Sequence, residues 1–194
     1  MRTIPSEFLS LLQRFRPDGV GELCVIDVAD LPTDAAKLLV HDGDMTSRLE
    51  ALHSDRICLD VLNCVVGDDG GYYREVVLRK VSDSFAVEYG VIEIVLSGFE
   101  SRLRAEITEG KVPLGGILNR ENISYFSEPQ CFFGVIPNAW MQVSFGVRPS
   151  VGLYGRCNIL KSGDGNVLAR IVEVLPSLAA YQTVSKKQRK ETQA

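Results

Sequence analysis

The stretch Gly71-Tyr-Tyr-Arg-Glu-Val-Val-Leu-Arg-Lys80 places one arginine inside a run of aromatic and β-branched residues. This composition is typical of a β-strand with at least one buried face. Because side chains alternate along a strand, Arg74 shares one face with Val76 and Leu78, and Tyr73 lies on the other. A charge on a buried face needs a partner, since an unpaired buried charge is strongly destabilising. That partner is either a carboxylate of the protein or an anionic ligand.

Two further strand-like runs, residues 57–66 and 85–95, flank this stretch. The cluster Gly67-Asp-Asp-Gly-Gly71 is a hairpin signal before it, and Ser82-Asp-Ser84 is a turn signal after it. Connections this short cannot cross over a sheet, so the three runs predict an antiparallel meander.

A second hairpin is predicted near the end of the chain, where Lys161-Ser-Gly-Asp-Gly165 joins two strand-like runs. The pattern of residues 123–135 predicts another strand, and that of residues 141–147 predicts an edge or connecting strand. Residues 22–29 fit either a short helix or a strand.

Apolar residues recur at helical spacing at the N-terminus and in residues 98–110. Together these patterns predict an α+β fold, with one compact domain over residues 1–181 and a roughly six-stranded antiparallel sheet. Residues 182–194 are polar and are expected to form a disordered tail.

Composition narrows the function classes. The chain has 194 residues and a net charge of −4 with both signs mixed, which disfavours nucleic acid as a partner. No apolar run reaches the roughly 18 residues that a membrane span needs. The five cysteines are scattered without a CxxC pair, which favours reduced thiols in a cytoplasmic protein. No metal-ligand cluster or phosphate-binding loop is present, so we expect neither metal nor cofactor.

Glu173 is the second candidate site residue, because it is a lone carboxylate in the apolar run Ile171-Val-Glu-Val-Leu-Pro176. If its face of the strand is buried, desolvation raises the pKa of the carboxyl and makes it a candidate general acid. A structural ion pair, for example between Glu173 and Arg74, is the alternative.

Four segments, taken in order, resemble the chorismate pyruvate-lyase (4-hydroxybenzoate synthase) family. They are Leu38-Leu-Val-His-Asp-Gly-Asp-Met-Thr-Ser-Arg-Leu-Glu50, Tyr72-Tyr-Arg-Glu-Val-Val-Leu78, Pro113-Leu-Gly-Gly-Ile-Leu118, and Gly155-Arg156 followed by the hairpin and Val172-Glu-Val-Leu-Pro176. No single motif is specific, and the resemblance rests on their order and spacing over roughly residues 36–176.

The resemblance implies a cofactor-independent lyase that splits chorismate into 4-hydroxybenzoate and pyruvate, in aromatic acid biosynthesis for ubiquinone or a secondary metabolite. It also implies that helices cover an internal ligand cavity. Arg74 would hold the ring carboxylate, and Glu173 would lie at the ring oxygen, where it protonates the leaving group or hydrogen-bonds the product. Leu114 would contribute backbone hydrogen bonds, and Met45 an apolar wall.

One segment departs from the family pattern. Where one branch of the family carries an Arg-Thr pair, this chain has Glu88-Tyr-Gly90, so a second cation for the enolpyruvyl carboxylate must come from elsewhere. Arg156 is the candidate. Two other functions stay open: a lyase-like enzyme acting on a different enolpyruvyl or aromatic acid, and a non-catalytic domain that binds small aromatic acids as an effector sensor.

Overall fold

The computed structural model describes residues 3–148 and 152–176. Its helices are α1 (Ser6–Phe15), α2 (Thr33–Leu39), α3 (Met45–His53), α4 (Ser101–Glu109), α5 (Leu114–Arg120) and α6 (Ala139–Phe145), with short 3-10 turns at Val28–Asp30 and Leu96–Gly98. Its strands are β1 (Gly21–Ile26), β2 (Ile57–Val66), β3 (Gly71–Lys80), β4 (Ala86–Val95), β5 (Tyr125–Pro137), β6 (Leu153–Ser162) and β7 (Val167–Pro176).

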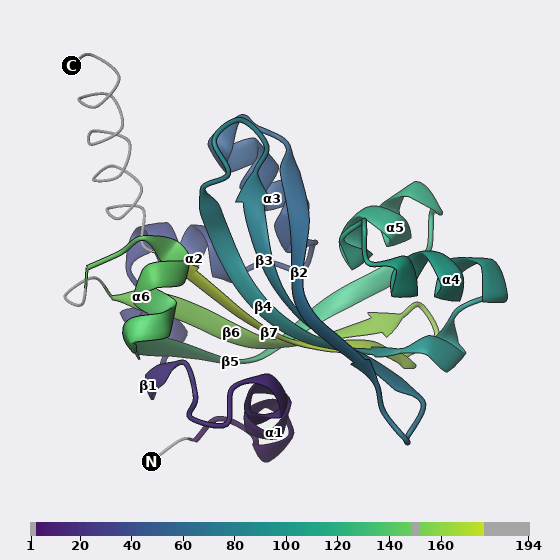
Figure 1. Ribbon diagram of the computed structural model, residues 1–194, viewed down its shortest axis with the longest axis horizontal. Helices are drawn as coiled ribbons and strands as arrows, with labels where there is room; N and C mark the ends of the chain where they lie inside the picture. The colour runs from purple at the N-terminus through teal and green to yellow at the C-terminus, as the bar shows by residue number, and fades with distance from the viewer. Residues whose placement is uncertain (1–2, 149–151, 177–194) are drawn as a thin grey trace.

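The strands form one seven-stranded sheet in the order β1-β5-β6-β7-β4-β3-β2, and every neighbouring pair is antiparallel (Figure 1). The predicted α+β class is therefore confirmed, as are the meander β2-β3-β4 and the hairpin β6-β7. The sheet has one strand more than expected, because Gly21–Ile26 forms edge strand β1, within the region around residues 22–29 that fitted either a short helix or a strand.

Both hairpins close where the sequence places glycine and aspartate. In the β6-β7 turn, Gly165 has φ +87°, a left-handed conformation that glycine adopts without steric cost. The backbone N–H of Ser162 then donates to the carbonyl of Asn166 at 2.8 Å, which closes the turn.

Helices cover both faces of the sheet. One face carries Tyr73, Tyr89 and Val174, and it packs against α1 and α6. The other face carries Tyr72 and Ile92, which pack against α4 and α5, and Leu78, which packs against α2 and α3. In Figure 1, α1 lies at the bottom of the view, on the opposite side of the sheet from α4 and α5. The predicted alternation of β3 is confirmed, because its two faces enter different clusters of the core.

The prediction of a strand at residues 141–147 is wrong, since this segment belongs to helix α6. The Asn138 side chain caps the helix by accepting a hydrogen bond from the Met141 N–H at 3.0 Å, and Gly146 ends it at φ +62°. Met141 and Phe145, four residues apart, both point into the core. The segment is too short for its apolar spacing alone to distinguish the two periods.

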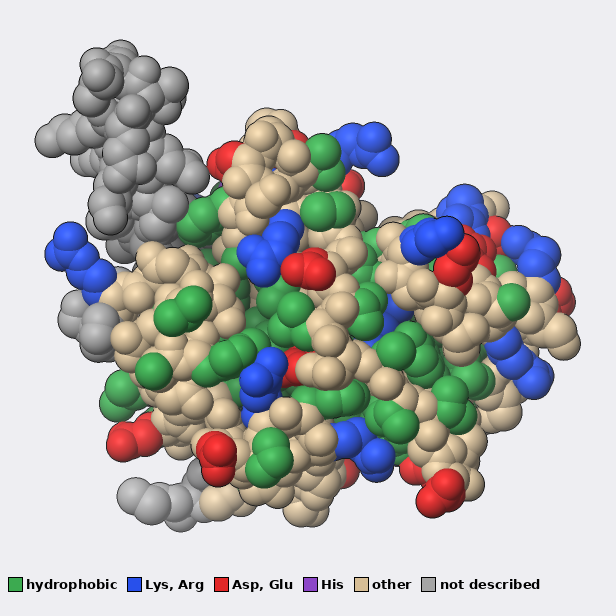
Figure 2. Space-filling view, in the orientation of Figure 1, with side chains coloured by type: hydrophobic (Ala, Val, Ile, Leu, Met, Phe, Trp, Pro, Cys, Tyr) green, Lys and Arg blue, Asp and Glu red, His purple; other side chains and the backbone are tan. Residues whose placement is uncertain are grey.

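None of the helices in the described ranges is long and apolar enough to cross a bilayer. The predicted tail at 182–194, and the end of the predicted domain at residue 181, lie outside the described residues. On the side seen in Figure 2, acidic and basic side chains are interspersed rather than gathered into one charged region.

Candidate functional site

A pocket lies over the centre of the sheet on the Arg74 face, between the start of α3 and the start of α5. The cavity itself is small, with about 70 Å³ open to the centre of a water-sized sphere, and it opens to solvent at its mouth. Most of its wall is apolar and comes from five strands and α5: Leu59, Val76, Ile92, Leu114, Leu160 and Ile171. A few polar side chains interrupt this wall, and each is placed by the register of the sheet.

Strand register sets the positions of these polar groups. Arg74 on β3 lies opposite Ile92 on β4. Four residues further along each strand, Leu78 lies opposite Glu88. Midway between them is Gly90, which lies opposite Glu173 on β7. A Cβ atom at Gly90 would lie 3.3 Å from Val76 Cγ2, so a larger residue here would fill the floor of the pocket.

Arg74 enters the pocket as an isolated cation. Its side chain is 2% exposed, and neither Nε nor Nη1 has a hydrogen-bond partner among residues 3–148 and 152–176. Burial lowers the pKa of the guanidinium. Of the two partners expected from the sequence, a carboxylate of the protein is therefore not found at Arg74 among the described residues.

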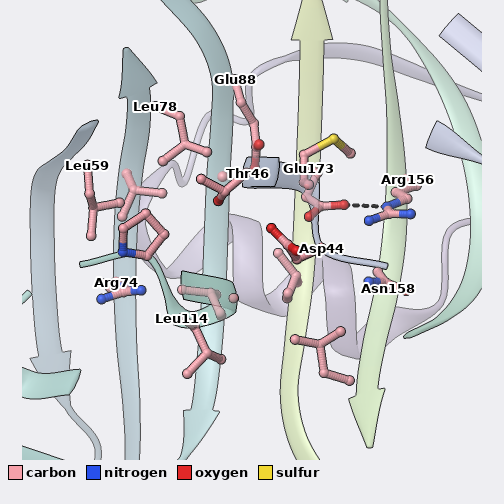
Figure 3. A pocket seen from close by; sticks show the side chains of 18 of the residues that line it. Asp44, Thr46, Leu59, Arg74, Leu78, Glu88, Leu114, Arg156, Asn158 and Glu173 are labelled. Atoms are coloured by element: carbon pink, nitrogen blue, oxygen red, sulfur yellow. Dashed lines mark hydrogen bonds and ion pairs between the residues drawn. The ribbon is translucent and has the colours of Figure 1, made fainter. Parts of the chain in front are cut away.

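Glu173 pairs with Arg156 and not with Arg74, so the alternative ion pair drawn from the sequence is wrong. The two residues face each other on neighbouring strands β7 and β6, and Arg156 Nε contacts Glu173 Oε2. Arg156 Nη1 also donates to the carbonyl oxygens of Leu39 at 2.9 Å and His41 at 3.3 Å. Figure 3 shows this pair across the pocket from Arg74.

Glu88 also lines the pocket, and sequence reasoning did not identify it as a site residue. It is 4% exposed, and within the described chain its Oε2 atom has no hydrogen-bond partner. Burial raises the pKa of the Glu88 carboxyl well above its usual range, and the nearby Glu173 carboxylate raises it further. The available signal was a lone carboxylate two residues before a glycine in an apolar strand.

Asn158 is the second polar residue that the sequence did not reveal. Its side chain is 1% exposed and its Oδ1 atom accepts a hydrogen bond from Ser127 Oγ at 2.9 Å. This bond fixes the amide so that Nδ2 is left as a donor without a partner in the part of the chain that the structure describes. An asparagine in a β-strand carries no signal of this kind until its neighbours are known.

Two helices meet over the pocket. Asp44 caps α3 by accepting from the Ser47 N–H at 2.7 Å, and its other oxygen accepts from Asn119 Nδ2 of α5 at 2.9 Å. Gly115 permits this approach, because a Cβ atom there would lie 2.8 Å from Asp44 Cβ. Met45 and Leu114, the first residues of the two helices, line the pocket beneath this contact.

All five residues predicted to bind substrate therefore border one pocket: Met45, Arg74, Leu114, Arg156 and Glu173. Their individual roles remain predictions. No group of three or more His, Cys, Asp or Glu side chains suited to hold a metal ion occurs within residues 3–148 and 152–176.

No family model and no curated protein matches the chain. Several solved structures do match its fold. The crystal structure of PhnF from Mycobacterium smegmatis aligns with a TM-score of 0.55 at 10% identity, over 88% of this chain and 93% of that chain. The effector domain of the same protein aligns with a TM-score of 0.52 at 12% identity, over 69% of this chain and 88% of that one. The possible transcriptional regulator YydK from Bacillus subtilis aligns with a TM-score of 0.50 at 12% identity, over 64% and 60%. At such low identity the likeness concerns architecture alone, and this chain shares its fold with the effector domain of PhnF.

Proposed function

We propose that this chain binds a small aromatic monocarboxylic acid, whose carboxylate is held by Arg74. The observation that carries the proposal is the buried guanidinium with two unpartnered donor nitrogens at an apolar pocket. A carboxylate matches a guanidinium in shape, charge and hydrogen bonding, and it supplies the partner that a buried cation requires. The apolar walls favour a ring as the rest of the ligand.

A role in sensing fits the comparisons better than catalysis does. The similar structure of PhnF is that of an effector domain, and none of the similar structures named above is described as an enzyme. The electrostatics of the pocket agree with this proposal. Chorismate carries two carboxylates, whereas the second arginine, Arg156, is already engaged by Glu173 and two carbonyl groups.

Calorimetric titration of benzoate and 4-hydroxybenzoate tests the proposal. Arg74→Met should weaken binding by about 100-fold or more, equivalent to about 2.8 kcal/mol. The variant should stay folded, since it loses a buried charge that has no partner. Arg79→Met is the matched control, because Arg79 lies on the same strand and pairs with Asp60 outside the pocket. Equal affinity in the wild type and in Arg74→Met would contradict the proposal.

A second candidate function is cleavage of chorismate, favoured by the two carboxyl groups of Glu88 and Glu173 across the pocket from Arg74. A carboxyl with a raised pKa could protonate the departing enolpyruvyl oxygen, while the enclosed pocket orients the ring. Arg156 would then have to share its charge between Glu173 and the second carboxylate.

Incubation with chorismate separates these functions. Equimolar pyruvate and 4-hydroxybenzoate would establish the lyase, and Glu173→Gln should then lower turnover more than affinity. Pyruvate with a different aromatic product would indicate a lyase-like enzyme for another acid. A raised melting temperature with 4-hydroxybenzoate, without turnover of chorismate, would support the binding domain.

A further inference from the structure

Glu88 has no assigned role in the binding of a carboxylate at Arg74, yet it is buried at the same pocket with an unpartnered oxygen. Its charged neighbours on the packed elements are Glu173, Arg156 and Asp44. Arg156 is engaged by Glu173, and Asp44 accepts hydrogen bonds from Ser47 and Asn119. None of the described side chains hydrogen-bonds Oε2 of Glu88, so this oxygen is available to a group of the ligand.

The sheet places this group at the opposite end of the ligand from Arg74. Arg74 and Leu78, the partner of Glu88, are four residues apart on β3. At about 3.4 Å per residue, the two levels of the sheet are about 14 Å apart. The arginine and glutamate side chains reach into this span from its two ends, so the remaining space suits a single ring substituted at opposite positions. Figure 3 shows Arg74 and Glu88 on different sides of the pocket.

The charges around Glu88 restrict what that second substituent can be. A carboxylate would meet the Glu88 and Glu173 carboxyl groups, and the nearby cation Arg156 is already paired. An ammonium group would be paired only by an ionised Glu88, and burial together with the nearby Glu173 carboxylate opposes that ionisation. A hydroxyl group brings no charge, and it can accept from a protonated carboxyl or donate to an ionised one. Burial raises the pKa of the Glu88 carboxyl well above its usual range, which favours the protonated form relative to an exposed glutamate.

We propose that Glu88 is the specificity-determining residue of this pocket: its carboxyl hydrogen-bonds an uncharged hydroxyl group on the ring of the bound acid and excludes acids that carry a second charge there. The inference rests on the proposed function, since the ligand must first be anchored by Arg74. It assigns the ligand to the ring-hydroxylated monocarboxylic acids, and it predicts that dicarboxylates are rejected.

The test compares benzoate, 4-hydroxybenzoate, benzene-1,4-dicarboxylate and 4-(aminomethyl)benzoate by calorimetric titration. In the wild type, the hydroxyl group should raise affinity by about tenfold or more over benzoate, and both doubly charged acids should bind more weakly than benzoate. Glu88→Gln is the matched control, because its amide has the same shape, bears no charge and still donates and accepts; it should keep the preference for the hydroxyl group. Glu88→Leu should abolish that preference, so that the ratio of the affinities for 4-hydroxybenzoate and benzoate falls to about one.

The outcomes separate the two proposals. If none of the acids binds, the proposed function fails. If benzoate binds through Arg74 but Glu88→Leu keeps the preference for the hydroxyl group, the role of Glu88 is refuted. Tightest binding of the dicarboxylate or of the ammonium compound by the wild type would refute it as well. Should Glu88→Leu not fold, Glu88→Ala provides the same comparison, because it empties the site instead of filling it.

Discussion

Two buried arginines, Arg74 and Arg156, lie on the same face of the sheet, and they differ in their hydrogen-bond partners. Arg156 contacts Glu173 and donates hydrogen bonds to the carbonyl oxygens of Leu39 and His41. It therefore links β6 to β7 and to the end of α2. Arg74 has no comparable contact among the described residues. The first is therefore part of the framework, and the second is available to a ligand.

This difference predicts opposite costs of substitution. Arg156→Met should lower the free energy of unfolding by about 3–5 kcal/mol, because it leaves the Glu173 carboxylate buried and alone. The double variant Arg156→Met/Glu173→Leu should be more stable than Arg156→Met, since no unpaired charge remains. Urea unfolding of Arg156→Met, Glu173→Leu and the double variant measures this coupling. If the two losses in free energy of unfolding are strictly additive, the ion pair contributes nothing.

At the residue scale, the sequence was sufficient to show that Arg74 needs a partner, but not which one. The pairing of Glu173 depends on strand order: β4 separates β3 from β7, while β6 lies directly beside β7. Strand order across a sheet is set by long-range packing, so it cannot be predicted from the local sequence of any one strand. The same limit explains why Asn158 was missed, since it stands out only once its neighbours are known. Glu88 did carry a signal, as a lone carboxylate in an apolar strand, but its missing partner is visible only in the structure.

At the scale of elements, turn chemistry made the prediction reliable. The meander and the last hairpin were predicted because Gly and Asp clusters separate their strands. Short elements without such boundaries were harder: β1 was left open between helix and strand, and α6 was predicted as a strand. For α6, the deciding features are its cap at Asn138 and its end at Gly146.

The contact between α3 and α5 offers a test with two adjacent glycines. Alanine usually stabilises a helix relative to glycine by about 0.5–1 kcal/mol. At Gly116 the new methyl group would lie 3.4 Å from Val112 Cγ1 and should be tolerated. At Gly115 it would lie 2.8 Å from Asp44 Cβ, so α5 has to move away from α3. We expect Gly115→Ala to release 4-hydroxybenzoate faster and Gly116→Ala to leave the rate unchanged, as measured by stopped-flow competition. Equal release rates would show that this contact does not close the pocket.

For the whole molecule, acid should be destabilising in a defined range of pH. Burial and the positive charge of Arg156 lower the pKa of His41 from 6.5 to about 4 in the folded protein. Between these values the unfolded chain binds more protons, so the contribution of His41 to stability is complete above pH 6.5 and is lost as the pH falls through 4. The full shift corresponds to about 3 kcal/mol.

Chemical unfolding at a series of pH values checks this expectation. His41→Gln should flatten the curve between pH 6.5 and 4 relative to the wild type, whatever its effect at neutral pH. Parallel curves for the two proteins would assign the acid sensitivity to other groups.

The position of β7 in the sheet also has a consequence for biosynthesis. In the described chain, β2, β3 and β4 form one half of the sheet and β1, β5 and β6 the other, and β7 bonds to both. As the ribosome extends the chain, each half can assemble early, but the seam between them stays open until Val167–Pro176 has emerged from the exit tunnel. Glu173 arrives with that strand, so a nascent chain holds Arg156 without its counter-charge until the halves are joined. The ligand pocket and the sheet are thus completed in the same event.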